Sequence, residues 1–167
     1  MSDVQALRST RTFKSLGVTL MAMLVLVTGL FGSVSSAQAA PAQSLGDRVV
    51  STAFKYNGYR YRYGGASPSG FDCSGFVYYV YKQAGYTVGR DTNAQYNSGT
   101  RVGFSQLQPG DIVLFSNTYR RGLSHAAIYI GGGKIIHAVN ESVGVTVSNL
   151  NSSYWRSHFT TGVRPAN

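Results

Sequence analysis

The sequence has few acidic residues and only one cysteine. Its 167 residues include six Asp or Glu against 15 Lys or Arg, so the formal net charge is +9 at pH 7. The single Cys73 excludes a disulfide within the chain, and its thiol is either a small buried side chain or a reactive group. The three histidines include no pair one helical turn apart, so we expect no metal site and no cofactor.

The N-terminal segment lacks an apolar run of membrane-spanning length. Three basic residues are followed by the apolar stretch 16–31 and then by small residues that end at Ala37-Gln38-Ala39. This order is typical of a secretory signal peptide. The run is interrupted by Gly17 and Gly29 and is shorter than the roughly 20 apolar residues that a spanning helix needs. We therefore predict a signal peptide over 1–39, cleaved after Ala39, and no stable membrane insertion afterwards.

The remaining residues, 40–167, are predicted to form one exported domain. Removal of 1–39 takes away three basic residues and Asp3, which leaves a net charge of about +7. Such a length suffices for one hydrophobic core. Export to the periplasm, the cell wall or the exterior argues against nucleic acid as a partner, whereas a basic protein is drawn to anionic wall polymers or lipid head groups. We expect a monomer.

Helical patterns come first in this domain and strand patterns follow, which predicts an α+β fold with an antiparallel sheet. Aromatic and basic residues alternate over 58–63, which indicates an extended segment, and a glycine-rich loop follows over 64–70. The expected helices are 45–57 capped by Ser44, 72–85 capped by Asp72, and 92–96 capped by Thr92. The expected strands cover 111–115, 125–130, 134–139, 143–148 and about 159–164.

Cys73 directly follows Asp72, the expected N-cap, and so lies in the first turn of a helix. Free backbone N–H groups and the positive end of the helix dipole favour a thiolate there. A free cysteine has a pKa of about 8.5, and we expect the thiol of Cys73 to have a lower pKa at this position. Gly70 and Gly75 on either side allow a substrate to approach closely. Cys73 is therefore predicted to be a nucleophile.

A cysteine nucleophile needs a base, which is usually histidine. His125 and His137 flank the hairpin signal Gly131-Gly132-Gly133. If the turn takes three residues, or a bulge restores that register, Val139 faces His125 and both rings share one face of the sheet. A two-residue turn would place the rings on opposite faces. On a shared face His125 can accept the thiol proton while His137 orients it, and His158 is expected to be structural or exposed.

Five blocks along the chain carry a resemblance to a known family. Phe71–Val77 is similar to a nucleophile motif, and Ser124–Gly131 is similar to a catalytic-histidine strand. The other blocks are Gly58–Gly65, a tyrosine loop, Leu107–Val113, which leads into the sheet, and Ile135–Ala138, which supplies a third polar residue. In this order, and over about residues 45–165, they resemble the NlpC/P60 family of papain-like cell-wall peptidases.

The resemblance implies a papain-like α+β fold, with N-terminal helices packed on a four- to six-stranded antiparallel sheet. It implies a cysteine peptidase in which Cys73 is the nucleophile, His125 the base and His137 the orienting residue. The expected reaction is hydrolysis of peptidoglycan stem peptides through a thioester, with the bond between γ-D-glutamate and the diamino acid favoured. Neither a metal nor a cofactor is needed.

The resemblance also implies three residues that bind the substrate. Tyr61 would hold the oxyanion together with a backbone N–H of Cys73, while Asp72 and Ser74 would bind the free amine of a stem peptide that begins with L-Ala. Asp72 also has its structural role as an N-cap. Tyr59-Arg60 and Tyr63 depart from the residues common in the family's tyrosine loop, which affects the expected fine specificity.

Other functions remain open on the sequence alone. The enzyme could cut the cross-link between D-Ala and a diamino acid, or the amide between muramic acid and L-Ala. The free-amine site argues against the amidase, because the L-Ala nitrogen of that substrate is acylated. A domain that binds wall peptides without cutting them is a further alternative, although all three triad positions are filled. An enzyme that transfers acyl groups on lipids, built on a related fold, would agree with the basic charge of the domain. The signal peptide and the glycine-rich loops fit the cell-wall enzymes better.

Overall fold

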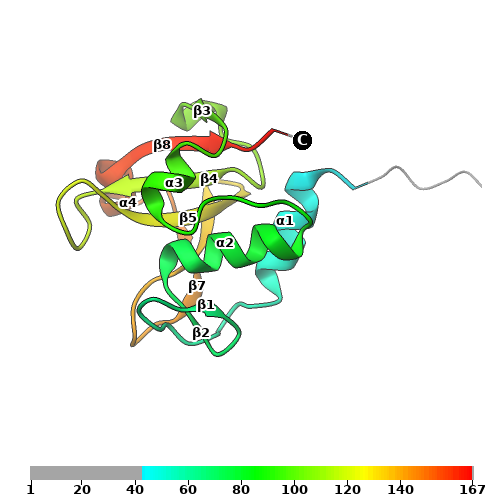
Figure 1. Ribbon diagram of the computed structural model, residues 1–167. Coiled ribbons are helices and arrows are strands. Elements are labelled where there is room, and N and C mark those ends of the chain that lie inside the picture. Colours follow the sequence, from blue (N-terminus) through cyan, green and yellow to red (C-terminus); the bar gives the residue numbers. More distant parts are fainter. Residues whose placement is uncertain (1–42, 167) are drawn as a thin grey trace, which may run out of the picture. The chain divides into compact units, whose positions relative to one another are not determined.

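The computed structural model describes residues 43–166 (Figure 1). The predicted signal peptide, 1–39, lies outside the described residues. Within 43–166, no helix combines the length and apolar character needed to cross a bilayer.

The first two helices lie where the sequence predicts them. α1 covers Leu45–Phe54, and the Ser44 hydroxyl accepts a hydrogen bond from the Asp47 N–H at its start. It ends three residues before the expected 57. α2 covers Cys73–Gln83 and begins with the carboxylate of Asp72 accepting from the Gly75 N–H. The apolar face of α2 is fully buried, so tertiary packing stabilises it more than helix propensity does.

The shorter helices differ more from the expectation. α3 covers Thr92–Tyr96, as predicted, but its N-cap is Asp91 and not Thr92. The Asp91 carboxylate accepts from two backbone N–H groups of the first turn, in line with the preference for Asp over Thr at an N-cap. The helix α4, Ser153–His158, and the 3-10 turn η2, Phe104–Gln106, were not predicted.

Six antiparallel strands form the main sheet, in the order β3-β8-β4-β5-β6-β7. This confirms the predicted fold class. All five predicted strands are present within a few residues of their expected bounds, and β3 is an addition. The strands are β3 Thr100–Val102, β4 Ile112–Ser116, β5 Leu123–Gly131, β6 Lys134–Ala138, β7 Val145–Asn149 and β8 Phe159–Arg164.

The segment before α2 is less regular than the alternation over 58–63 suggests. In that range Tyr61 makes only an isolated bridge to Phe71. Two short strands, β1 Ala66–Ser67 and β2 Gly70–Phe71, instead pair within the predicted loop. This small ribbon leads directly into Asp72 and Cys73 and so fixes where α2 begins.

Alternation along the strands divides the core into two layers. Ile112, Leu114 and Ile128 face α1 and α2, which lie together on one side of the sheet (Figure 1). Val113, Phe115 and Ile135 face the other side, where Trp155 of α4 covers them. Burial of each such large apolar side chain contributes about 1.5–3 kcal/mol, so both faces stabilise the sheet.

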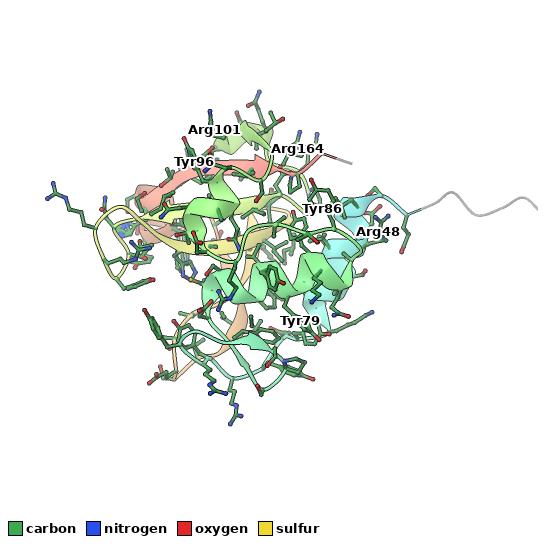
Figure 2. All side chains as sticks on the ribbon, in the orientation of Figure 1. Arg48, Tyr79, Tyr86, Tyr96, Arg101 and Arg164 are labelled. Carbon is green, nitrogen blue, oxygen red and sulfur yellow. The ribbon has the colours of Figure 1, made fainter. Side chains whose placement is uncertain are left out.

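Contacts of arginine side chains hold the first helix and the last strand to the middle of the domain. Arg48 of α1 donates to the carbonyl oxygen of Ala84 just after α2 (3.1 Å). Arg164 of β8 makes two hydrogen bonds, of 2.9 and 2.8 Å, to the buried carboxylate of Asp111. Figure 2 shows Tyr96 and Arg101 close together, and the guanidinium carbon of Arg101 lies 4.9 Å from the Tyr96 ring centroid.

Candidate active site

The sulfur of Cys73 lies at the start of α2, against the backbone of β5. Its side chain is buried, and the thiol donates to the carbonyl oxygen of Ser124, with an Sγ···O distance of 3.9 Å. This hydrogen bond goes to the residue before His125 and not to the imidazole. Rotation of the thiol away from Ser124 is therefore part of any reaction in which His125 accepts its proton.

The thiol is less acidic than its position in the helix suggests. Burial raises the pKa of Cys73 above its ordinary value, and the nearby carboxylate of Asp72 raises it further. Hydrogen bonds from the backbone, including those at the start of α2, act in the opposite direction but do not outweigh the loss of hydration. The expected lowering of this pKa is thus wrong for the resting site.

The hairpin between β5 and β6 has the register that brings the two histidines together. Ile128 faces Ile136 and Tyr129 faces Ile135, which is the register of a three-residue turn. A bulge between Tyr129 and Gly131 provides it, because Gly131 itself pairs with Lys134. Gly131 and the two glycines after it all have positive φ, which suits glycine at this turn. The predicted alternative of a bulge is therefore confirmed.

His125 and His137 share one face of the sheet and are joined directly. The Nε2 of His125 lies 2.7 Å from the Nδ1 of His137, and the Nε2 of His137 lies 2.8 Å from the Ser148 hydroxyl of β7. One imidazole must donate and the other accept in the first of these bonds. Ser148 was not predicted, although the alternation of β7 places it on the same face.

Both imidazoles are neutral at pH 7. Burial lowers the pKa of His125 to about 4 and lowers the pKa of His137 well below its ordinary value. Trp155 contributes to this burial, since its ring stacks on His125 (centroids 5.2 Å apart) and meets His137 edge-on at 4.8 Å. Each imidazole is therefore present as the free base at pH 7, although its lowered pKa makes it a weaker base than an ordinary imidazole.

Cys73 and His125 line one cavity of about 610 Å³. Three tyrosines also line it, namely Tyr61, Tyr63 and Tyr119, together with residues 139–142 of the loop after β6. Tyr63 and Tyr119 are strongly exposed (80% and 61%) and form the rim. Of the residues that the sequence singles out, the structure thus brings Cys73, His125 and Tyr61 to one opening, with His137 directly behind His125.

Tyr61 is half-buried beside the thiol. Burial, followed by the proximity of Cys73, raises its pKa to about 12. Its hydroxyl therefore keeps its proton at neutral pH and can donate a hydrogen bond to an oxyanion. The isolated bridge to Phe71 holds this part of the loop against the segment that leads into α2.

A second cavity, of about 330 Å³, shares Cys73 and the three tyrosines with the first and is also lined by Asp72, Ser74 and Arg90. Arg90 donates to both carboxylate oxygens of Asp72 (3.0 and 2.9 Å) and to the Ser74 hydroxyl (3.1 Å). It also donates to the carbonyl oxygen of Gly65. Arg90 was not predicted as a site residue, because its partners lie at least 16 positions away in the sequence.

Two remaining expectations concern metal ions and His158. Among residues 43–166, no three His, Cys, Asp or Glu side chains cluster as a metal site would require. His158 lies in α4, where its ring packs against Tyr154 with centroids 4.5 Å apart. It lines neither of the two cavities beside Cys73.

Comparison with known proteins identifies one matching family and several relatives. The NlpC/P60 family model matches residues 58–164. The chain is 48% identical over 118 residues to the gamma-DL-glutamyl hydrolase of Bacillus subtilis, covering 70% of this chain and 28% of that protein. It is 43% identical over 107 residues to the probable endopeptidase p60 of Listeria seeligeri, covering 64% and 20%. The chain thus spans less than a third of these two relatives.

Solved structures show the same similarity. The NlpC/p60 domain of the peptidoglycan hydrolase SagA superposes with a TM-score of 0.63 at 38% identity, covering 71% of this chain and 97% of that one. An NlpC/P60 family protein from Bacillus cereus superposes with a TM-score of 0.67 at 32% identity, covering 71% and 39%.

Proposed function

This chain belongs to the NlpC/P60 family, and on that premise we propose that it is a cysteine endopeptidase that hydrolyses peptidoglycan stem peptides. The favoured bond joins the γ-carboxyl of D-glutamate to the diamino acid. The names of its relatives support this choice, since one is a gamma-DL-glutamyl hydrolase and others are endopeptidases. The observation that carries the proposal is the 2.7 Å contact between His125 and His137 beside a cavity that Cys73 also lines.

The resting site holds a neutral thiol and a neutral imidazole. Because burial raises the pKa of Cys73 and lowers the pKa of His125, the proton moves to His125 as the sulfur attacks the γ-carbonyl carbon. The S–C bond forms and the carbonyl π electrons move to oxygen. Tyr61 and the N–H groups at the start of α2 stabilise that oxyanion.

The tetrahedral intermediate then collapses with His125 as the acid. His125 gives its proton to the nitrogen of the diamino acid, the C–N bond breaks, and a thioester remains on Cys73. A water molecule loses a proton to His125 and attacks the thioester carbon, which restores the thiol and releases the γ-carboxylate. His137 orients His125 throughout, and Ser148 orients His137.

The roles of Asp72 and Ser74 are proposed in a modified form. Asp72 is already paired with Arg90, so the free amine of L-Ala would join an existing ion pair and would not meet an isolated carboxylate. The second cavity remains the place for this end of the substrate, because Asp72 and Ser74 line it.

We also propose that residues 1–39 direct export and that 40–167 form the mature catalytic domain, acting as a monomer on the cell wall. N-terminal sequencing of the exported protein tests the boundary. A mature N-terminus other than residue 40 would contradict it.

Product identification tests the proposed reaction. The purified protein is incubated with L-Ala-γ-D-Glu-L-Lys and with the meso-diaminopimelate analogue, and the products are identified by mass spectrometry. Release of L-Ala-D-Glu and the free diamino acid, absent in Cys73→Ala, is expected. Cleavage of cross-linked dimers or of muramoyl-L-Ala amides alone would overturn the γ-bond proposal.

A further inference from the structure

Glu141 differs from the other carboxylates of the described residues. Each of the other four within 43–166 has a structural partner, whereas Glu141 makes neither a hydrogen bond nor an ion pair with any described residue and is exposed. The four engaged carboxylates are Asp47 with Ser44, Asp72 with Arg90, Asp91 with N–H groups of α3, and Asp111 with Arg164. In a chain with so few acids, a free carboxylate is available for a ligand.

Glu141 lines the same cavity as Cys73 and His125. It belongs to the turn between β6 and β7, which internal hydrogen bonds hold in place. The Asn140 side-chain oxygen accepts from the N–H groups of Ser142 and Val143. The end of this turn is fixed to the tyrosine loop, because Val145 donates to the carbonyl oxygen of Tyr59. Glu141 is thus presented to the cavity from an ordered turn.

The proposed reaction needs a place for each half of the substrate, and Cys73 lines both cavities. His125 lines the larger cavity and does not line the smaller one, while Asp72 and Ser74 line the smaller one. His125 must reach the departing nitrogen to protonate it. The leaving half of the substrate therefore occupies the larger cavity, together with Glu141.

Among residues 43–166, Glu141 is the only charged side chain that lines the larger cavity at neutral pH. The other ionisable groups there are the three tyrosines, the thiol and His125, and no Lys or Arg of the described part of the chain lines this cavity. A carboxylate in a cavity that no cation lines favours a positively charged ligand there and disfavours a negatively charged one. The leaving residue in the proposed reaction carries such a cation, the ammonium at the end of its side chain.

We propose that Glu141 binds the side-chain ammonium of the diamino acid in the leaving half of the substrate, and thereby favours lysine over diaminopimelate. Lysine ends in a single positive charge. Diaminopimelate carries a carboxylate beside its ammonium, and that carboxylate is repelled by Glu141. This inference rests on the proposed function, since it assigns a partner to the residue that the reaction releases.

Three tripeptide substrates test the assignment. They are L-Ala-γ-D-Glu-X, in which X is L-lysine, Nε-acetyl-L-lysine or meso-diaminopimelate. For the native protein we expect a kcat/KM that is about two- to fivefold higher for the lysine substrate than for either of the others. This factor corresponds to the free energy of an exposed ion pair. The preference should decline as NaCl is raised from low to high concentration, because salt screens such a pair.

Charge variants identify the residue responsible. In Glu141→Gln the ratio between lysine and acetyl-lysine should fall to about one, and in Glu141→Lys diaminopimelate should become the preferred substrate. Asp47→Asn is the matched control, because it removes the same charge from α1, outside the cavity, and should keep the original ratio.

The results separate this inference from the proposed function. Equal cleavage of all three substrates by the native protein, or a lysine preference that persists in Glu141→Gln, would overturn the role of Glu141 and leave the proposed reaction standing. Cleavage of none of the three would overturn the proposed reaction, and this inference with it.

Discussion

The Nε2 of His125 lies 2.7 Å from the Nδ1 of His137 on the neighbouring strand. This contact depends on the bulge at the end of β5, which shifts the register between Tyr129 and Gly131. Without the bulge, the pairing would turn one ring to the opposite face of the sheet. The second ring of the pair has its own partner in Ser148, so three strands together orient the ring of His125.

Removal of His137 should therefore have a larger effect on the turnover rate, kcat, than on the strength of substrate binding. In His137→Ala the ring of His125 loses the partner that fixes its tautomer, and kcat is expected to fall by about 10²-fold, at the low end for acid–base catalysis. KM should change less than threefold, by analogy with groups that act only in the transition state. Ser148→Ala should lower kcat by a few-fold only. Steady-state kinetics on the tripeptide substrates measure both parameters.

The dependence of kcat/KM on pH shows whether His137 orients His125 or only packs against it. If His137 only stabilises the fold, its removal would change the fraction of folded protein and leave the acid limb of the profile in place. Loss of orientation should move that limb, because the pKa of His125 depends on its surroundings. A His137→Ala variant with native kcat and a native profile would contradict the proposed role.

The buried histidines predict a loss of stability at mildly acidic pH. Burial lowers the pKa of His125 to about 4 from an ordinary 6.5, so the unfolded chain binds a proton before the folded one does. The stabilisation from the neutral ring is fully present above pH 6.5 and is lost as the pH falls toward 4. His125 alone should lower the free energy of unfolding by about 2 kcal/mol between pH 7.5 and 5, and His137 acts in the same direction.

Urea unfolding at pH 7.5, 6.0 and 5.0 measures this dependence. All three pH values lie above about 4, where ordinary carboxylates titrate. His125→Gln should unfold with a weaker dependence on pH over the same range, although its stability at pH 7.5 will be lower. The same slope in the native protein and in His125→Gln would contradict the explanation.

Much of the fold could be predicted because its main elements carry strong local patterns. α1 and α2 have caps and apolar faces, and β4, β5 and β6 are apolar runs separated by turn residues. β3 has a single buried residue in three, and no residue of α4 is fully buried. Such short, exposed elements leave no periodic signal, because their structure depends on contacts with distant segments.

The candidate site was predictable where spacing determines geometry. Counting across the glycine turn predicted the shared face of His125 and His137 as one of two possible registers, between which the structure decides. The start of α2 followed from the Asp72 cap. Trp155 and Arg90 reach the site from distant parts of the chain, and a single sequence does not reveal such contacts. The direction of the pKa shift of Cys73 was missed for the same reason, since burial depends on the whole fold.

Arg90 is expected to make the thiol more acidic by neutralising Asp72. The charge of Asp72 raises the pKa of Cys73, and Arg90 holds that carboxylate through two hydrogen bonds. In Arg90→Gln the uncompensated charge should raise the pKa of the thiol by up to about one unit, within the usual range for a nearby charge. The rate of alkylation by iodoacetamide, measured from pH 6 to 10, should therefore reach its midpoint at a higher pH.

Two further variants make the alkylation experiment specific. The double variant Arg90→Gln/Asp72→Asn should restore the midpoint, because neither charge remains and asparagine still caps the helix. Arg101→Gln removes a cation that lies over Tyr96, outside both cavities beside Cys73, and should leave the midpoint where it was. An unchanged midpoint in Arg90→Gln would show that Arg90 does not act through the charge of Asp72.

Gly75 is expected to be required for activity because the tyrosine loop rests on it. A Cβ at position 75 would collide with the backbone carbonyl of Gly65, and it would also press on Arg90 and Asp72. The gain of about 1 kcal/mol that Gly→Ala gives in an ordinary helix should be exceeded by the cost of overpacking, typically about 1–3 kcal/mol. Displacement of Gly65 would also move Tyr61, which lies four positions earlier beside the thiol.

Gly46→Ala provides the matched control, since a Cβ there would meet the backbone carbonyl of Pro109. Gly46 also lies in a helix, but it lines a cavity other than the two beside Cys73. Thermal unfolding should show that both variants are destabilised. Per folded molecule, however, Gly46→Ala should keep its kcat/KM, while Gly75→Ala should lose about tenfold or more, because oxyanion donors are sensitive to small displacements. Equal specific activities in the two variants would mean that Gly75 serves stability alone.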